Sequence, residues 1–187
     1  SNFTDNAANI GGAVYIGGLD ASVTGSAFSG NEADDGNAIY NNGTLTLSGN
    51  AINKNGADIY STNNISTTVY VIVNDNTTIE AEYYDTIHVV LKFTDDSGNL
   101  IDVNATSITV DLPSGVTYRS TLYHNASAGV FEGDVIVKKS GRITPSRLTI
   151  ANYFTNYNVN TNLNSSYVIM SKVDSTLEVT YNNVSNP

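Results

Sequence analysis

A tyrosine recurs at the same place in a repeated segment of this sequence. Tyr15, Tyr40 and Tyr60 close the segments GGAVY, GNAIY and GADIY. Each phenol ring offers apolar area and a hydroxyl group, a combination suited to sugars and protein surfaces. If the residue before each tyrosine faces inward, strand alternation sends the tyrosines outward as a stacked, exposed row, which we predict to be a binding surface. The alternatives are that the row only stabilises the structure, or that a corner turns the rings inward.

Half of the basic residues lie within ten positions, around the turn Ser140-Gly141. They are Lys138, Lys139, Arg142 and Arg147. On an acidic protein such a loop could bind an anionic glycan or wall polymer. The alternative is a solvated hairpin tip whose charges balance nearby acids.

An oxygen-rich loop offers the only candidate metal ligands. Asp95, Asp96, Asn99 and Asp102 have the hard oxygen donors that Ca²⁺ prefers. Turn formation by Asp95-Asp96-Ser97-Gly98-Asn99 between two apolar strands explains the same residues without calcium. We expect no other metal and no cofactor.

Two histidines and one lysine are further candidates for chemistry. His88 and His124 are isolated in the sequence, and without a third ligand we interpret them as ordinary strand residues. A buried Lys92 with Asn152 and an acid would be the candidates for an isopeptide crosslink.

Eight Asn-x-Ser/Thr sequences mark candidate glycosylation sites. They begin at Asn2, Asn42, Asn64, Asn76, Asn104, Asn125, Asn164 and Asn183. The composition alone predicts nearly as many, so glycosylation depends on export of the chain.

Composition restricts the protein class. The 187 residues carry a net charge of −10, from 8 Lys plus Arg against 18 Asp plus Glu, which disfavours nucleic acid and anionic lipid as partners. Cys and Trp are absent, and Asn, Ser and Thr are abundant, as is typical of β structure rather than helix. No apolar run approaches the roughly 20 residues that span a bilayer, so we expect no membrane insertion. We expect an extracellular protein of the cell surface or wall.

The elements that position the tyrosines form a repeat in the first third of the chain. FTDN at residues 3–6 returns as FSGN at 28–31 and INKN at 52–55, in step with the tyrosine segments. Each copy holds three short apolar strands separated by Gly, Asn and Asp, which suit corners. One copy cannot bury its apolar face alone, so copies stack as rungs of a parallel β-helix.

The paired motifs F-x-x-N and G-G-A-[I/V] resemble the polymorphic outer-membrane protein repeat, which also fills adhesin-like surface proteins of methanogenic archaea. The resemblance covers residues 1–65 and implies about two and a half rungs of right-handed parallel β-helix, with further repeats of the same chain on both sides. The third copy departs from the motif and is predicted to be the last, capping rung.

Residues 66–187 show short alternating strands with turns between them, typical of an antiparallel sandwich. The predicted strands are 68–73, 78–82, 86–94, 100–103, 107–112, 116–124, 129–138, 147–152, 166–171 and 175–181. The string from Leu91 to Leu112 resembles the immunoglobulin-like repeats of bacterial and archaeal surface adhesins. The fold expected for the whole chain is therefore all-β: a right-handed parallel β-helix (1–65) followed by an immunoglobulin-like antiparallel β-sandwich (66–187).

The expected function is adhesion rather than catalysis. Polysaccharide-cleaving β-helix enzymes need a carboxylate cluster beside a basic group, or two carboxylates at a defined separation. Residues 1–65 contain no Arg or His, a single Lys54 and scattered acids, so we expect no catalytic residues. The resemblance implies an adhesin-like protein that attaches to host or microbial cells through a surface glycan or protein. The alternatives are a structural surface stalk and, less favoured, a carbohydrate-active enzyme.

Overall fold

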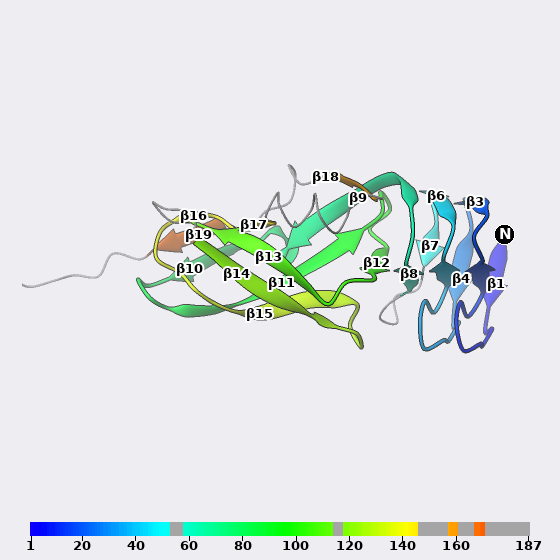
Figure 1. The fold of residues 1–187 in the computed structure, drawn as a ribbon, viewed down its shortest axis with the longest axis horizontal. Coiled ribbons are helices and arrows are strands. Elements are labelled where there is room, and N and C mark those ends of the chain that lie inside the picture. Colours follow the sequence, from blue (N-terminus) through cyan, green and yellow to red (C-terminus); the bar gives the residue numbers. More distant parts are fainter. Residues whose placement is uncertain (53–57, 114–117, 146–156, 161–166, 171–187) are drawn as a thin grey trace, which may run out of the picture.

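The computed structural model describes residues 1–52, 58–113, 118–145, 157–160 and 167–170. These residues form an all-β fold (Figure 1), with one 3₁₀ turn, η1 (Asn74–Asn76), and no α-helix among them. The first strands lie at one end of the molecule, and β10 (Thr78–Ala81), β16 (Gly141–Arg142) and β19 (Tyr167–Met170) lie at the other.

Nine strands from the repeat stack in three parallel ladders. The ladders are β1 (Asn2–Thr4), β4 (Ala27–Ser29) and β7 (Ala51–Ile52); β2 (Val14–Ile16), β5 (Ile39–Asn41) and β8 (Ile59–Ser61); and β3 (Asp20–Thr24), β6 (Thr44–Ser48) and β9 (Ile65–Val73). Equivalent positions pair in register, Phe3 with Phe28 and Val14 with Ile39. The stacking of repeat copies predicted from the spacing is therefore confirmed for these strands.

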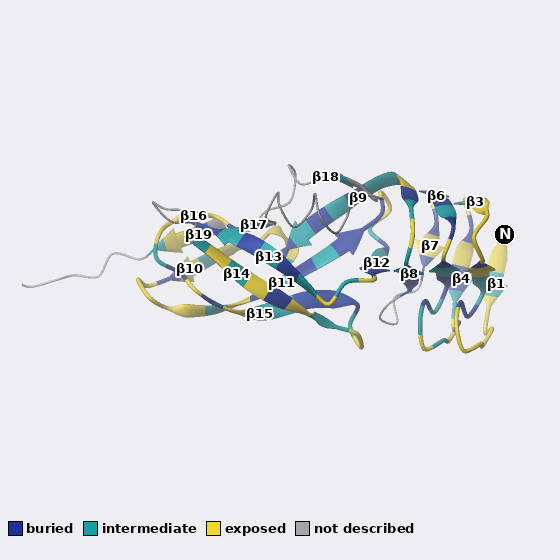
Figure 2. Cartoon of the chain, in the orientation of Figure 1, coloured by how far each residue is buried: buried dark blue, intermediate teal, exposed yellow. Residues whose placement is uncertain are grey.

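The interior of the stack is made by one residue type above another. The rings of Phe3 and Phe28 lie parallel, with centroids 4.8 Å apart. Ile39, Leu45 and Ile59 are completely buried (Figure 2). Apolar burial of this kind is the main stabilising contribution that a repeat can make to its neighbours.

Asparagines and glycines hold the corners between the strands. Asn31 Oδ1 accepts hydrogen bonds from both the backbone and the side-chain nitrogen of Asn6, and its own Nδ2 donates to Phe3 O. The first glycine of the tyrosine segment has a positive φ in two copies, +62° at Gly11 and +67° at Gly36, where a side chain would be strained. These contacts explain why F-x-x-N and the glycine recur together.

The remaining strands are mostly antiparallel. They are β10, β11 (Thr86–Thr94), β12 (Leu100–Val103), β13 (Ser107–Leu112), β14 (Tyr118–Asn125), β15 (Val130–Ile136), β16, β17 (Thr144–Pro145), β18 (Tyr157–Asn160) and β19. The largest sheet runs β17-β13-β14-β15-β11-β12-β8-β5-β2, while β10-β19-β16 and β1-β4-β7 form two smaller sheets. The pairs β10–β19 and β18–β9 are parallel, which the sequence did not predict.

The two parts of the chain share strands. β12 pairs antiparallel with β11 at Phe93–Ile101, and parallel with β8 at Ile101–Ile59, so it adds a fourth layer to the tyrosine-bearing ladder. β9 begins at Ile65 beside β6 and continues as the antiparallel partner of β11. The expected boundary between residues 65 and 66 therefore falls inside one strand. β12 stacks on the third repeat copy in this ladder but has no copy of the repeat motif, so it stays a prediction that the third copy is the last rung of the repeat.

Most predicted strands in the second part are confirmed to within a few residues. The turn Asp95–Asn99 joins β11 to β12 as expected, with Gly98 N donating to Asp95 O at 3.1 Å. The predicted strands 147–152 and 175–181 lie outside the described residues.

Candidate functional site

The predicted tyrosine row is present in the structure. Tyr15, Tyr40 and Tyr60, here called the tyrosine ladder, pair in register on β2, β5 and β8. The ring centroids are 5.4 Å apart between Tyr15 and Tyr40 and 5.5 Å apart between Tyr40 and Tyr60, with rings 14° and 19° from parallel. Tyr15 is 54% exposed, and the other two are half-buried. The rings point outward, so the alternative in which a corner turns them inward does not hold.

Stacking determines which parts of the ladder a ligand can reach. The faces of Tyr40 are covered by its two neighbours, so this ring presents its edge and hydroxyl group. Tyr60 has Tyr40 on one side and the β12 layer on the other, where Asp102 occupies the next ladder position. The ladder is thus a strip of ring edges that ends at the junction with β12.

A surface hollow of about 300 Å³ lies at that end of the ladder. This terminal hollow is lined by Tyr60, Asn104, Ala105, Thr106 and His124. The first comes from the repeat, the next three from the segment that joins β12 to β13, and the last from β14. The side chains of Asn104 and Thr106 make no hydrogen bond with another described residue, so both can bind a ligand.

His124, which lines the terminal hollow, is paired with a buried carboxylate. His124 Nε2 lies 2.7 Å from Asp102 Oδ1, and the Asp102 side chain is only 3% exposed. Burial raises the pKa of the Asp102 carboxyl group above its usual value, while the attraction of His124 opposes that rise and Asp35 adds to it. His124 lies on β14, as expected of a strand residue, but it is not isolated in space, because folding brings it onto an aspartate from another hairpin.

Tyr60 responds to the same acidic surroundings. Burial raises the pKa of its hydroxyl group, and the charges of Asp35 and Asp102 raise it further. Tyr60 therefore stays neutral and keeps its O–H as a hydrogen-bond donor.

The four candidate calcium ligands do not converge on one point. Asp95, 2% exposed, accepts hydrogen bonds through Oδ1 from the backbone N–H groups of Ser97 and Asn99, and through Oδ2 from Asn99 Nδ2. Asp96 Oδ1 accepts from Ser97, and Asp102 binds His124. Among the described residues no three acidic or histidine side chains are placed to hold a metal ion. Turn formation accounts for the loop, and calcium binding there stays an untested prediction.

The described basic residues around the turn Ser140-Gly141 lie in different environments. Lys138 Nζ lies 4.6 Å from the ring centroid of Tyr118 and 5.2 Å from that of Tyr84, a cation–π geometry. Tyr84 is 56% exposed and has a φ of +74°, unusual for an aromatic residue. Lys139 and Arg142 are exposed, and Arg147 lies outside the described residues.

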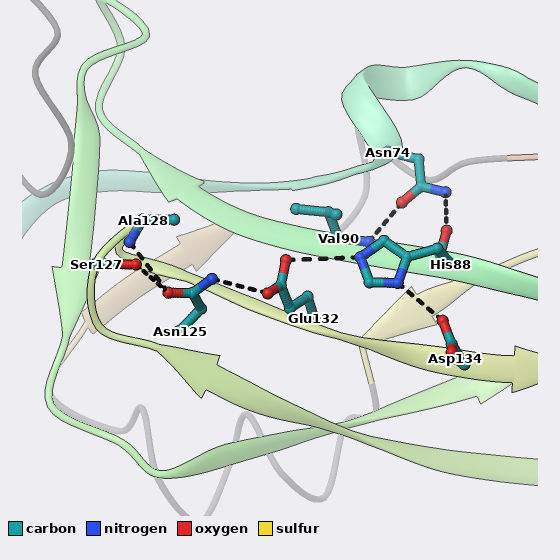
Figure 3. A network of polar contacts seen from close by, with 8 residues as sticks. All are labelled: Asn74, His88, Val90, Asn125, Ser127, Ala128, Glu132 and Asp134. Carbon is teal, nitrogen blue, oxygen red and sulfur yellow. Dashed lines mark hydrogen bonds and ion pairs between the residues drawn. The ribbon is translucent and has the colours of Figure 1, made fainter.

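His88 lies in a second polar network (Figure 3), on the face formed by β11 and β15. Its Nδ1 is 2.9 Å from Asp134 Oδ1, and its Nε2 is 3.6 Å from Glu132 Oε2. The hydrogen bond to Asp134, assisted by Glu132, raises the pKa of His88, although slight burial lowers it. This histidine is not isolated either, but its side chain is 55% exposed.

The candidate crosslink and the sequons are only partly described. Lys92 Nζ forms an ion pair with Asp75, and Asn152 lies outside the described residues. Asn2, Asn42, Asn76 and Asn104 are exposed, Asn64 and Asn125 are half-buried, and Asn164 and Asn183 are not described. Asn125 Nδ2, the atom that would carry a glycan, donates to Glu132 Oε1 at 2.8 Å.

The terminal hollow is the feature that sequence reasoning missed. Asn104 and Asp102 were singled out for glycosylation and calcium, and His124 was set aside, but no spacing in the sequence places them beside Tyr60. The described residues contain no helix long and apolar enough to cross a membrane.

Comparison with known proteins identifies no relative. No family model matches the sequence, and no curated protein or solved structure is significantly similar to it. The tyrosine ladder and the terminal hollow are therefore the main features that bear on function.

Proposed function

We propose that this chain is part of an extracellular, adhesin-like protein that attaches a cell surface to other cells through a surface glycan or protein. In this proposal the stacked repeats are a right-handed parallel β-helix, the strands after them are an immunoglobulin-like sandwich, and both belong to a surface protein like those of methanogenic archaea. The repeats present the binding surface, and the sandwich acts as a spacer.

The tyrosine ladder is the observation that carries the proposal. A tyrosine on a protein surface does not need to stack on other tyrosines. Here, however, three tyrosine side chains lie in register, and Tyr15 keeps 54% of its surface exposed. Tyrosine gives a large contact area for little loss of side-chain entropy, which is why it is enriched in binding surfaces.

Rigidity supports the same proposal. Asn50 Oδ1 accepts from Ser26 N, Asn50 Nδ2 donates to Val23 O, and Asn99 Nδ2 donates to Asn50 O, which links the β11–β12 turn to the repeats. A surface held in this way loses little conformational freedom when it binds.

A second candidate function, a surface stalk without a ligand, is favoured by one observation. The faces of Tyr40 are used for stacking on its neighbours, so the ladder also serves to hold the layers together. A binding experiment must therefore separate the hydroxyl edge of the ladder from its stacking.

Binding of the fluorescently labelled protein to a panel of microbial and host-type cells tests the proposal. We compare the unmodified protein with Tyr15→Phe/Tyr40→Phe, which keeps the rings and removes two hydroxyl groups, and with Tyr15→Ser, which removes the exposed ring. We expect saturable binding that falls by about tenfold in Tyr15→Ser, because truncation of an exposed aromatic anchor commonly costs over 1 kcal/mol. Tyr83→Ser is the matched control, because Tyr83 is 60% exposed and lies outside the ladder.

Three results would contradict the proposal. Equal loss of binding in Tyr83→Ser would show that the ladder is not the adhesive surface. A folded protein that binds no cell type would favour the stalk. Release of reducing or unsaturated sugar ends from polysaccharides would favour the enzyme.

A further inference from the structure

The terminal hollow lies at the end of the tyrosine ladder. There the ring of Tyr60 borders open space, whereas both faces of the Tyr40 ring are covered. Tyr60 is the only member of the ladder that lines the hollow. Because Tyr40 covers one side of the Tyr60 ring and β12 forms the next layer, the hollow lies where the stacking of rings stops. An aromatic ring next to such a space can pack against a flat apolar surface of a ligand.

Three of the other lining side chains can form hydrogen bonds with a ligand. Asn104 supplies an amide and Thr106 a hydroxyl group, and neither is engaged by another described side chain. His124 uses Nε2 to bind Asp102, and its Nδ1 makes no hydrogen bond to a described residue. Together these groups donate and accept hydrogen bonds, as a ligand with several hydroxyl groups requires.

The charges around the terminal hollow and its volume restrict the class of ligand further. Asp102 is 3% exposed and its charge is opposed by His124, so it offers little to a cationic ligand. The charges of Asp35 and Asp102 both act on Tyr60, and no Lys or Arg of the described segments lines the hollow, so an anionic ligand is disfavoured. A volume of about 300 Å³ is at the lower end of the range for small-molecule sites, enough for one ring.

We propose that the terminal hollow binds a single neutral sugar ring, packed against Tyr60 and hydrogen-bonded by Asn104, Thr106 and His124. The proposal rests on the adhesive function proposed above and names the ligand class of one end of the same surface. It assigns to His124 a binding role that is distinct from its structural contact with Asp102.

The position of Asn104 adds a consequence for the natural protein. Asn104 and Thr106 are the first and third residues of a sequon, and both line the hollow. A glycan on Asn104 would occupy the rim of the hollow and compete with a ligand. The test therefore uses protein prepared without N-linked glycans.

Chemical shifts of the backbone amides provide the readout. The full chain, labelled with ¹⁵N, is titrated with neutral methyl pyranosides of gluco, galacto and manno configuration and with N-acetylglucosamine. Glucuronate and tetramethylammonium chloride are the charged probes. We expect at least one neutral sugar to shift the amides of Asn104, Ala105 and Thr106 in a saturable way, with millimolar affinity, and the charged probes to leave them unchanged.

Variants decide whether the shifts report the hollow. Ala105→Leu fills it and should weaken the sugar by about tenfold, and Thr106→Val, which removes one hydroxyl group at constant shape, should weaken it several-fold. Tyr83→Ser, at an exposed tyrosine outside both the ladder and the hollow, should leave the sugar affinity unchanged. Variants that keep the wild-type amide spectrum elsewhere are taken as folded.

The results distinguish this inference from the proposed function. If no neutral sugar shifts the hollow amides, or if glucuronate or tetramethylammonium does so instead, the assignment is overturned, even when cell binding depends on Tyr15. If a neutral sugar binds but Ala105→Leu does not weaken it, the sugar binds elsewhere and the assignment is again overturned. Sugar binding that Ala105→Leu weakens supports it, whether or not cells are bound.

Discussion

At the level of single residues, the two histidines differ in how far their carboxylate partners are removed from water. Asp102, the partner of His124, is 3% exposed, whereas Asp134, the partner of His88, is 68% exposed. The same pair of residue types therefore serves two different ends. The buried pair, His124 and Asp102, fixes the wall of the terminal hollow. The exposed pair, His88 and Asp134, adds a weak, pH-dependent contact between β11 and β15.

Replacing His124 by Ala should destabilise the protein by about 2–3 kcal/mol at pH 7, because a buried carboxylate is left without its partner. Burial already raises the pKa of Asp102, so its ionised form is the unfavourable one, and stability falls as the pH rises through the folded pKa. Without His124 that pKa rises further. Urea unfolding at pH 7 and pH 4 checks this, and a loss at pH 4 as large as that at pH 7 would contradict it.

Replacing His88 by Ala should have the opposite pH dependence and a smaller size. The raised pKa of His88 means that its contact with Asp134 stabilises the fold fully below the unfolded pKa, about 6.5, and is lost as the pH rises through the folded pKa. Because the side chains are exposed, we expect a loss below about 1 kcal/mol at pH 5.5 and none at pH 9. Unfolding at both pH values, with an NMR titration of the ring, provides the measurement.

At the level of elements, polar corner residues determine how closely the layers stack. Asn50 is 3% exposed and satisfies one backbone N–H group and one carbonyl group of the layer below, at 3.1 and 2.7 Å. Buried backbone groups without partners are costly, so such an asparagine contributes more than a surface residue of the same type.

Replacing Asn50 by Ala should therefore lower the free energy of unfolding by about 2–3 kcal/mol. Asn9→Ala is the matched control, because that side chain is exposed and should change stability by less than about 0.5 kcal/mol. Thermal and chemical denaturation of both variants test the prediction. Equal effects would mean that the corner contacts of Asn50 do not stabilise the stack.

At the level of the whole molecule, the shared strands should make the two parts of the chain unfold together. β9 is hydrogen-bonded to β6 at its start and to β11 further on, and β12 joins β8 to β11. The buried apolar residues of both parts also form one continuous cluster. A tandem of independent domains would have neither feature.

We expect a single unfolding transition. A destabilising substitution in either part of the chain should lower the free energy of unfolding of the whole protein. Leu45→Ala in β6 and Leu91→Ala in β11 each remove a completely buried side chain and should each cost about 2–5 kcal/mol. Hydrogen exchange should show β5 and β15 losing protection to the same extent in both variants. Two transitions, of which Leu45→Ala lowers only one, would establish independent domains instead.

The repeat in the sequence by itself determined much of the structure of this protein. The return of the phenylalanine and tyrosine segments at steps of 20–25 residues predicts the register of Phe3 on Phe28 and the row of tyrosines, and both are confirmed. The alternation in β11 and β13 likewise predicts strands with the observed bounds. These features follow from local periodicity, which a chain carries in its own spacing.

Only the tertiary structure decided the fourth layer and the terminal hollow. Ile101 stacks on Ile59 and Asp102 on Tyr60 although β12 has no copy of the repeat motif, and His124 reaches Asp102 from a different hairpin. Contacts of this kind depend on which hairpin packs against which sheet edge. The packing energy of the whole core determines that arrangement, and residue spacing does not. For the same reason Asp102, close to the Asp95–Asn99 turn in the sequence, is paired with His124, while Asp95 and Asn99 are hydrogen-bonded to each other within the turn.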